Sequence, residues 1–527
     1  MFKNHTKQLS TVFSKKNYLL LCALLLSVVI PLTPKIPLFE VIPGYIVRVR
    51  FEDIVILSVA IFWLIQLLRK KISVESKLTK PLIAHIITGG ISVLLALFVL
   101  HTVPFEASHV LKTVLHYLRN IQYIFMFFLG FTAIKSQKDI SIFISVTLFT
   151  LGIVGLYGVG QKYLQFPVYS TMNREFSAGI QLVLTEHARV QSTFGGHYDL
   201  AAYLVIMLPL VLSQALSIKK KYLKSAMWGL FILSTWLITV TAARTSFIAA
   251  TIGVSLVILI YASFQDTLKQ KSLFFCKNML IVSSIFGFIF FQFGGDIRER
   301  MLHALQGYPQ IYGVYRQTVN LFPRSKTDEI DNVMVSSDSQ PVPKKPNDIY
   351  VDVPDLVKVA TISADGTKKI IIVEAPRVYS DNALKYGLSM AIRLDTLWPQ
   401  AISGFYRNPL FGSGYATLTK SEITEFTEAD STDNNFLRTL GETGLAGFIT
   451  FYGSILLIVK IAYTQTKHKT PTVLKAVSIA FIAGTIGLLF NAIYIDVFVA
   501  SKVALTFWLL AGMIVAIETV HRNKNGS

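Results

Sequence analysis

Cysteine and charged residues are scarce in this sequence. Among 527 residues there are two cysteines, and only 15% of the chain is Asp, Glu, Lys or Arg. The cysteines, Cys22 and Cys276, lie in or beside apolar runs, so they offer neither a disulfide framework nor a metal-binding cluster. A hydrophobic share of 52% with so few charges excludes an ordinary soluble protein.

Long apolar runs take up most of the chain. A transmembrane helix needs about 20 predominantly apolar residues, and roughly twelve runs come near that length. They lie at 18–34, 53–68, 82–101, 113–134, 140–160, 198–216, 223–241, 245–264, 278–293, 434–461, 473–494 and 498–519. The first run has no small-residue cleavage site at its end, which indicates a retained span rather than a signal peptide. The sequence therefore predicts an all-α polytopic membrane protein.

Basic residues outnumber acidic ones, 50 against 31, which gives a formal net charge of +19. Many of them flank the apolar runs in alternate loops, at 69–71, 135–138, 219–224 and 269–277. Because cytoplasmic loops carry the excess of Lys and Arg, this pattern predicts cytoplasmic N- and C-termini and a multi-pass protein of the plasma (inner) membrane. The charge therefore indicates membrane topology, and we expect no nucleic-acid partner.

The same orientation places a long polar segment outside the cytoplasm, between the ninth and tenth spans. It divides the chain into a first membrane part, 1–293, an extracytoplasmic domain, 294–432, and a second membrane part, 433–527. Within this domain the β-branched runs LVKVATI and KKIIIVEA flank an Asp-Gly turn signal, which predicts a β-hairpin. A helix is expected from Ser380 or Asp381 toward Trp398, limited by Pro399. The domain is therefore expected to be α+β.

Three arginines on the expected outer side are candidates for binding an anion. Arg244 lies between two spans with almost no loop, where a charge is costly unless it faces water, protein or an anion. Snorkelling toward lipid headgroups is the alternative. Arg393 lies in the later half of the helix expected in the outer domain, where it could simply complement the helix dipole. Arg189 precedes the sixth span, and nearby His197 and Asp199 are expected to cap or pack against that helix.

The start of the tenth span is unusually polar. Asp433, Asn434 and Asn435 open it, and polar residues continue for several positions before the apolar run begins. Such a mouth at a membrane boundary indicates a water-filled region beside lipid. Capping of the helix is the alternative for the first residues. Arg438 and Glu442, four residues apart, could form a buried structural pair.

These motifs together resemble the O-antigen ligase and polymerase family of membrane glycosyltransferases. In the ligases, the end of the large outer loop carries a His-Asn-type pair, nine residues, and then Gly-x-x-Gly. This chain has Asp433-Asn434 and, after the same spacing, Gly444-Leu-Ala-Gly447. Aspartate replaces the histidine, and the threonines that follow the second glycine in the family are absent.

Other motifs extend the resemblance over residues 185–450. Arg244 in Ala-Arg-Thr-Ser is similar to the family's arginine at the outer start of a span. The family's loop arginine and its Pro…Gly-x-Gly continuation resemble Arg393, Trp398, Asn408-Pro409 and Gly412-Ser-Gly414. Arg189, followed by Thr193-Phe194-Gly195, is also similar to the family pattern. The first five spans fit the family by topology only.

The resemblance implies a GT-C-like fold and glycosyl transfer. The donor would be a glycan on polyprenyl pyrophosphate, and the partners would be that donor, a glycan or lipid acceptor, and membrane lipid. Guanidinium groups of Arg244 and Arg393 would stabilise the leaving pyrophosphate without a metal or other cofactor. Asp433 would accept the proton of the acceptor hydroxyl. Arg189, Asn434, Asn435 and Arg438 are the residues expected to bind substrate.

Two other interpretations stay open at this point. The aspartate at position 433 leaves a polymerase, which joins repeat units, as plausible as a ligase. A transporter or flippase for a lipid-linked glycan is the alternative without catalysis, because about twelve spans would also suit one. Two matching halves and charges midway through the spans would favour transport, whereas the charges of this chain gather at the expected outer mouth.

Overall fold

The computed structural model describes residues 17–43, 45, 48–172, 175–305, 345–346, 355–362, 368–375, 377–418, 431–467 and 472–525. The chain divides into two compact units. Unit 1 comprises 1–297 and 400–527, and unit 2 comprises 298–399. The extracytoplasmic domain predicted at 294–432 is therefore longer at both ends than unit 2, because the residues from Gln400 onward group with the helix bundle.

Unit 1 is a bundle of long helices, and each apolar run predicted from the sequence overlaps one of them. Its helices are α2 (Tyr18–Leu32), α3 (Phe51–Leu68), α4 (Thr79–Phe98), α5 (Ala107–Ala133), α6 (Gln137–Tyr163), α7 (His197–Ser217), α8 (Lys221–Val240), α9 (Arg244–Ser263), α10 (Leu268–Phe293), α16 (Asn435–Lys467), α17 (Thr472–Asn491) and α18 (Ser501–Asn525). Among the described residues, ten helices are long and apolar enough to cross a membrane. The two others are α2, which is shorter, and α5, whose first half is polar.

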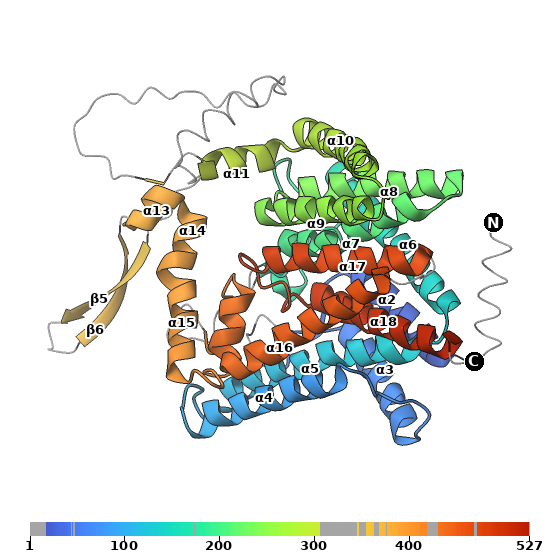
Figure 1. The fold of residues 1–527 in the computed structure, drawn as a ribbon. Coiled ribbons are helices and arrows are strands. Elements are labelled where there is room, and N and C mark those ends of the chain that lie inside the picture. Colours follow the sequence, from blue (N-terminus) through green and yellow to red (C-terminus); the bar gives the residue numbers. More distant parts are fainter. Residues whose placement is uncertain are drawn as a thin grey trace, which may run out of the picture. The chain divides into compact units, whose positions relative to one another are not determined.

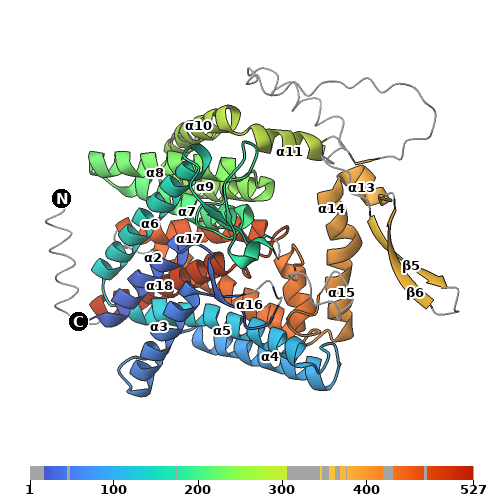
Figure 2. The same ribbon diagram turned by 180° about the vertical axis from the view of Figure 1, so that it is seen from behind.

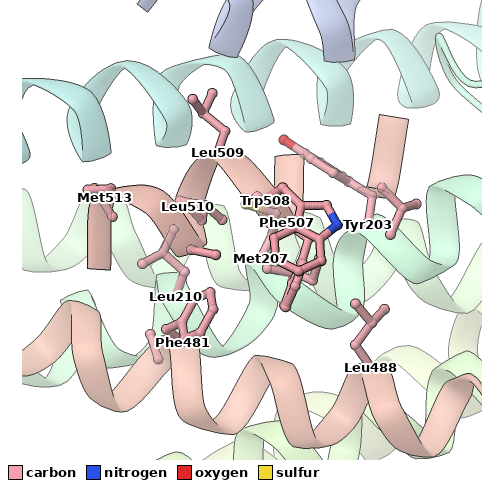
Figure 3. Close-up of a cluster of buried hydrophobic side chains, with 14 of the residues drawn as sticks. Tyr203, Met207, Leu210, Phe481, Leu488, Phe507, Trp508, Leu509, Leu510 and Met513 are labelled. Carbon is pink, nitrogen blue, oxygen red and sulfur yellow. The ribbon is translucent and has the colours of Figure 1, made fainter. Parts of the chain in front are cut away.

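Helices α7, α17 and α18 form the centre of the bundle, and α3 and α10 lie at its periphery (Figures 1 and 2). In the most apolar stretches of α7 and α18, 89% of the residues are buried, against 22% in α3 and 17% in α10. Side chains of the three central helices interdigitate around Trp508, which is fully buried (Figure 3). The peripheral helices keep apolar side chains such as Leu57 and Phe288 on the outside, as expected for helices that face lipid.

Polar loops and helix ends meet at one end of the bundle, which we call the polar end. Helices α3, α7, α9, α16 and α18 begin there. Residues at or before their first turns form hydrogen bonds with residues at the ends of other helices. The Lys502 ammonium at the start of α18 donates to the carbonyls of Thr33, after α2, and Thr193, before α7, at 2.7 and 2.8 Å. The Val190 amide donates to the last residue of α8, Val240, at 3.2 Å. The polar end thus brings together loops from both halves of the chain.

Short strands and turns complete the connections between the helices of unit 1. Strand β1 (Pro37–Phe39) pairs antiparallel with β2 (Val49–Arg50), and β3 (Val168–Tyr169) pairs with β4 (Gln181–Leu182). A single 3-10 turn, η1 (Phe176–Ala178), lies between β3 and β4. Helix α15 (Trp398–Arg407) leads from unit 2 into unit 1, and α11 (Gly295–Leu305) leads out of it.

Unit 2 contains the predicted hairpin. Strands β5 (Asp355–Ile362) and β6 (Lys368–Ala375) pair antiparallel over their whole length, from Asp355 opposite Ala375 to Ile362 opposite Lys368. The Asp-Gly turn signal between them lies outside the described residues. The β-branched runs therefore form strands as the sequence predicts.

The prediction of one continuous helix from Ser380 or Asp381 toward Trp398 is wrong. Ser380 does cap a helix, since its hydroxyl accepts the Ala383 amide at 3.1 Å, but α13 (Asp381–Tyr386) ends at Gly387. The chain resumes as α14 (Leu388–Ile392) and a π-helical turn, η2 (Arg393–Leu397). Gly387 has φ 82°, a left-handed conformation that stops a helix. Pro399 does not end the helical run as predicted, because α15 follows η2 without a gap and continues to Arg407.

Candidate functional site

Asp433 lies in the turn that opens α16 and keeps part of its side chain exposed. Its φ of 49° is left-handed, a conformation that Asp tolerates better than most residues. The Ser431 hydroxyl donates to its Oδ1 at 2.7 Å. Asp433 does not cap the helix, because the N–H of Leu437 is accepted by the Asn434 side chain at 3.0 Å. Asn434, and not Asp433, therefore provides the side-chain cap of α16.

Asp496, in the connection between α17 and α18, holds this turn in place. Its carboxylate accepts the amides of Thr432 and Asn434, the two residues that flank Asp433, at 2.9 and 3.2 Å. It also accepts the Arg438 guanidinium at 2.9 Å. The Ser431 hydroxyl lies between the Asp433 and Asp496 carboxylates, 2.7 and 3.3 Å from them. A buried acidic group with these partners fixes both peptides on either side of Asp433.

Arg438 is buried and links two carboxylates. Besides Asp496, its guanidinium pairs with Glu442 at 3.3 Å, which confirms the predicted pair four residues apart. Glu442 in turn accepts the Ala416 amide at 3.1 Å. Asn435 also stabilises the fold, since its side chain accepts the Phe498 amide at 2.9 Å. Asp496, Arg438 and Glu442 therefore form a continuous buried network, which we call the Asp496 network.

The glycine motifs noted in the sequence meet one another beside this network. Helix α16 is interrupted at Gly444, whose φ of 63° and ψ of −165° are not helical. The next two amides, of Leu445 and Ala446, donate to the carbonyls of Pro409 and Leu410 at 2.9 and 3.0 Å. A side chain at Gly444 would collide with the backbone of Leu410, so the loop 408–411 requires glycine there. The two halves of α16 are thus joined by a loop from another part of the chain.

Arg244 and Arg189 lie at the polar end, near the start of α16. Arg244 is half-buried and is the first residue of α9. Two residues later, the Ser246 hydroxyl hydrogen-bonds Asn491, at the end of α17, at 3.2 Å. The next residue of that segment, Ala492, accepts the Asn435 amide at 2.8 Å. These bonds connect the start of α9 to the start of α16.

Arg189 is half-buried in the segment before α7. Its guanidinium contacts His197 and lies over the Tyr198 ring, with its central carbon 5.8 Å from the ring centroid. The neighbouring amide of Val190 bonds the end of α8, four residues before Arg244 in the sequence. His197 therefore meets an arginine instead of capping α7, whose N-cap residue, Gly196, has no side chain to do so.

Arg393 belongs to unit 2, where it begins the π-helical turn η2. Its guanidinium donates to the carbonyl and the hydroxyl of Ser389, at 2.5 and 2.9 Å. Two residues on, Asp395 accepts Ser380 at 2.6 Å and Asn382 at 2.5 Å, and these hydrogen bonds lower the pKa of Asp395. π-Helical turns are frequent at functional sites. Arg393 is thus held on a locally well-bonded segment of its own unit.

A second polar group lies at the polar end and was not predicted from the sequence. Lys35 pairs with Glu52 at 2.6 Å and also donates to Ser501 at 2.8 Å. Burial lowers the pKa of Lys35, and the Glu52 carboxylate opposes that shift. Asp53 pairs with Arg119 at 2.5 Å. These contacts join the starts of α3 and α18 to the middle of α5.

The signal for this group was present in the apolar run assigned to α5. His109, Lys112, His116, Arg119 and Tyr123 recur at spacings of three and four residues, which places them along one face of a helix. His116 bonds the Tyr45 hydroxyl at 3.0 Å, and Lys112 lies over the Tyr45 ring, with its Nζ 5.5 Å from the ring centroid. A polar face in a transmembrane helix normally turns toward protein or water. The sequence interpretation counted only the apolar residues of this run.

Comparison with known proteins adds no family to this description. No protein-family model matches the chain, and no curated protein matches it. The functional argument therefore rests on the residues gathered at the polar end.

The arrangement combines half-buried arginines with the partly exposed carboxylate of Asp433. Arginines 189 and 244 can bind an anionic oxygen through paired N–H donors, and Asp433 can accept a proton. Among the described residues, no group of three or more His, Cys, Asp or Glu side chains could hold a metal ion. Arg189, Arg244 and Asp433 can supply electrostatic stabilisation and proton transfer at the polar end.

Proposed function

We propose that the protein transfers a glycan from a polyprenyl-pyrophosphate carrier to an acceptor hydroxyl, outside the cytoplasm. Asp433 removes the proton of the acceptor hydroxyl, whose oxygen then attacks the anomeric carbon of the donor. The bond between that carbon and the pyrophosphate oxygen breaks, and the lipid pyrophosphate leaves. Arg244 and Arg393 stabilise the negative charge that develops on the leaving group. The product is a surface polysaccharide lengthened by a polymerase or attached by a ligase.

One observation carries this proposal: the carboxylate of Asp433 is held in place from both sides yet remains accessible. The neighbouring Asn434 and Asn435 side chains hold the helix start, since they accept the amides of Leu437 and Phe498. The two amides beside Asp433 are fixed by Asp496 instead, which is the kind of support a reactive group requires. Arg189, Asn434, Asn435 and Arg438 are proposed to line or support the substrate site.

The proposal includes a topology. Twelve spans, with α2 and α5 added to the ten apolar helices, would place both termini in the cytoplasm and the polar end outside the plasma membrane. The GT-C-like architecture would then present the polar end to the lipid-linked donor. The polyprenyl tail would lie in lipid beside the apolar faces of the peripheral helices.

Reconstitution tests the reaction directly. The full chain in liposomes would receive a polyprenyl-linked glycan, and release of polyprenyl pyrophosphate would be followed with and without a candidate acceptor. Release that depends on the acceptor supports transfer, and the length of the glycan product separates polymerase from ligase. No release with any acceptor would contradict the proposal.

The interruption of α16 favours a second candidate, a transporter for a lipid-linked glycan. Transporters often bind their substrate at helices that are broken within the membrane, and Gly444 breaks α16 in this way. The same liposomes decide between the two. Movement of the lipid-linked glycan across the bilayer, without release of pyrophosphate, would establish transport.

A further inference from the structure

Four charged residues at the polar end form a group that the proposed reaction does not use. They are Arg50, at the end of β2, Asp53, in the first turn of α3, Arg119, on α5, and Asp199, in the first turn of α7. The Arg50 amide donates to Asp53 at 3.0 Å, Asp53 pairs with Arg119 at 2.5 Å, and Glu52 and Asp199 act on Arg50 electrostatically, so charged residues from four elements meet here. We call them the Arg50–Asp199 group.

Two members of this group have unused hydrogen-bonding capacity. Arg50 is 9% exposed, and its Nε has no partner in the described part of the chain. The half-buried carboxylate of Asp199 accepts no hydrogen bond from any residue that the structure describes. A buried charge without partners is costly, so a structure normally keeps one only where something else supplies the bonds.

Arg48, two residues before Arg50, provides a comparison, because its guanidinium forms hydrogen bonds within the fold. Arg48 is similarly buried, at 7% exposed, but its Nε donates to Glu40 and its Nη1 to Ser177, both at 2.8 Å. The two arginines are separated by a single residue on the same short segment. Burial alone therefore does not explain the unused donors of Arg50.

The accessible surface of the group is mixed in charge. Arg119 is 24% and Asp53 15% exposed at the side chain, although they pair with each other. A ligand in contact with the group would meet two guanidinium groups and two carboxylates. A phosphate would be repelled by the carboxylates, and a cation by the arginines. An uncharged ligand rich in hydroxyl groups fits better, because each hydroxyl both donates and accepts.

Three further charged residues, Lys35, Glu52 and Lys502, act on the group electrostatically, and each is bound to other atoms. Lys35 and Glu52 pair with each other at 2.6 Å. Lys502 directs its ammonium to the carbonyls of Pro31, Thr33 and Thr193, at 2.7 to 3.1 Å. Neither pairs with the exposed part of the Arg50–Asp199 group.

We propose that the Arg50–Asp199 group is a binding subsite for an uncharged sugar, with Asp199 accepting from its hydroxyls and Arg50 donating to them. This inference rests on the proposed function, for which the subsite would hold a sugar of the acceptor. It assigns no role in bond breaking to the group. Its residues are expected to govern affinity for the sugar, whereas Asp433 governs the chemical step.

Binding is measured on the full chain in nanodiscs, without turnover. The probes are octyl glycosides of glucose, galactose, mannose, rhamnose and N-acetylglucosamine, below their micellar concentrations, with 1-octanol as the control for the tail. At least one glycoside should raise the thermal unfolding midpoint saturably, beyond the effect of octanol. Asp199→Asn and Arg50→Gln should each weaken that glycoside about tenfold, because each removes one charge-assisted set of hydrogen bonds. Arg48→Gln, the matched control, should bind it as the parent does.

These variants are suited to the test because no residue that the structure describes hydrogen-bonds the Asp199 carboxylate or the Arg50 Nε, and gel filtration verifies that they remain monodisperse. The inference is wrong if no glycoside exceeds octanol, or if the variants bind like the parent. Saturable binding of inorganic diphosphate that Arg50→Gln abolishes would also overturn it, since the group would then be an anion site.

Turnover separates this inference from the proposed function. In the transfer reaction, Asp199→Asn should raise the KM for the acceptor about tenfold and leave kcat at saturating acceptor unchanged. Glycoside binding without any transfer would sustain the subsite and reject the glycosyltransferase. Transfer with an unchanged acceptor KM in Asp199→Asn would reject the subsite alone.

Discussion

Two groups of polar residues at the same end of the bundle differ in how fully their side chains are used. In the Asp496 network, Arg438 lies between two carboxylates, and those carboxylates accept three backbone amides as well. In the Arg50–Asp199 group, and at Asp433, charged side chains keep accessible surface. The comparison teaches that charged residues at a membrane boundary can have two roles. Those of the Asp496 network stabilise the end of the bundle, and those of the second group are available to the ligands that we propose.

Removing Asp496 should have the largest effect. Asp496→Ala deprives Arg438 of one carboxylate and leaves the amides of Thr432 and Asn434 without an acceptor, so it should lower the free energy of unfolding by about 3–5 kcal/mol. Unfolding of the full chain in bicelles measures this. The exposed Asp266→Ala should stay within about 0.5 kcal/mol of the parent. A loss of the same small size for Asp496→Ala would show that the network does not build the fold.

Asp433→Asn should leave the fold intact and slow the reaction by about 10²–10⁴-fold, because an amide cannot accept the hydroxyl proton. Single-turnover transfer in liposomes measures the chemical step. Asp266→Asn is the control, since it makes the same change from carboxylate to amide at an exposed position beyond the end of α9, away from the polar end. If Asp433→Asn transferred sugar at the parental rate, Asp433 would belong with the structural residues.

Arg244→Lys and Arg393→Lys keep the charge but lose the planar fork of donors. Each should reduce turnover by about 10²-fold, with normal membrane insertion, because one point charge cannot bind the pyrophosphate oxygens in the same way. The exposed Arg407→Lys should have parental turnover. Normal rates in both lysine variants would remove these arginines from pyrophosphate recognition.

Substituting Arg48 and Arg50, which flank Val49, should give the smallest change and sharpen the comparison most directly. Arg48→Gln breaks bonds to Glu40 and Ser177 and should cost about 1–3 kcal/mol of unfolding free energy. Arg50→Gln breaks no such bond and should change it by less than about 1 kcal/mol. Thermal unfolding of both variants in nanodiscs provides the measurement. Equal losses would mean that Arg50 is used by the fold as Arg48 is.

Much of the fold could be predicted, because an apolar run long enough to cross a membrane rarely forms anything other than a transmembrane helix. The β-hairpin was predictable for the same reason, since β-branched runs surrounded a turn signal. The break at Gly387 was missed because apolar spacing continues across it, whereas the backbone conformation depends on one glycine. The π-helical turn that carries Arg393 has no pattern of its own in the sequence.

The candidate site was predictable only in part. Asp433, Arg244 and Arg189 were found because they stand at the edges of apolar runs. Asp496 was missed because its partners Thr432, Asn434 and Arg438 lie 58 to 64 residues away, so no local spacing relates them. Arg50 and Asp199 were not predicted as site residues. Their burial, and the lack of hydrogen-bond partners for the Arg50 Nε and the Asp199 carboxylate among the described residues, are visible only in the folded chain. Sequence patterns locate charged residues, but packing decides which of their side chains form hydrogen bonds and ion pairs within the fold.

Lys502 has a consequence for how the protein is assembled during synthesis. Its ammonium binds the carbonyls of Pro31, Thr33 and Thr193, which precede it by 471, 469 and 309 residues. Because a ribosome delivers the chain from its N-terminus, these carbonyls enter the membrane long before their donor and must rely on water or insertion factors meanwhile. Arrival of the last helix ends that dependence. Translation that stops before residue 502 would leave the Thr33 carbonyl, just after α2, without this donor, a defect by which membrane proteases can recognise an unfinished copy.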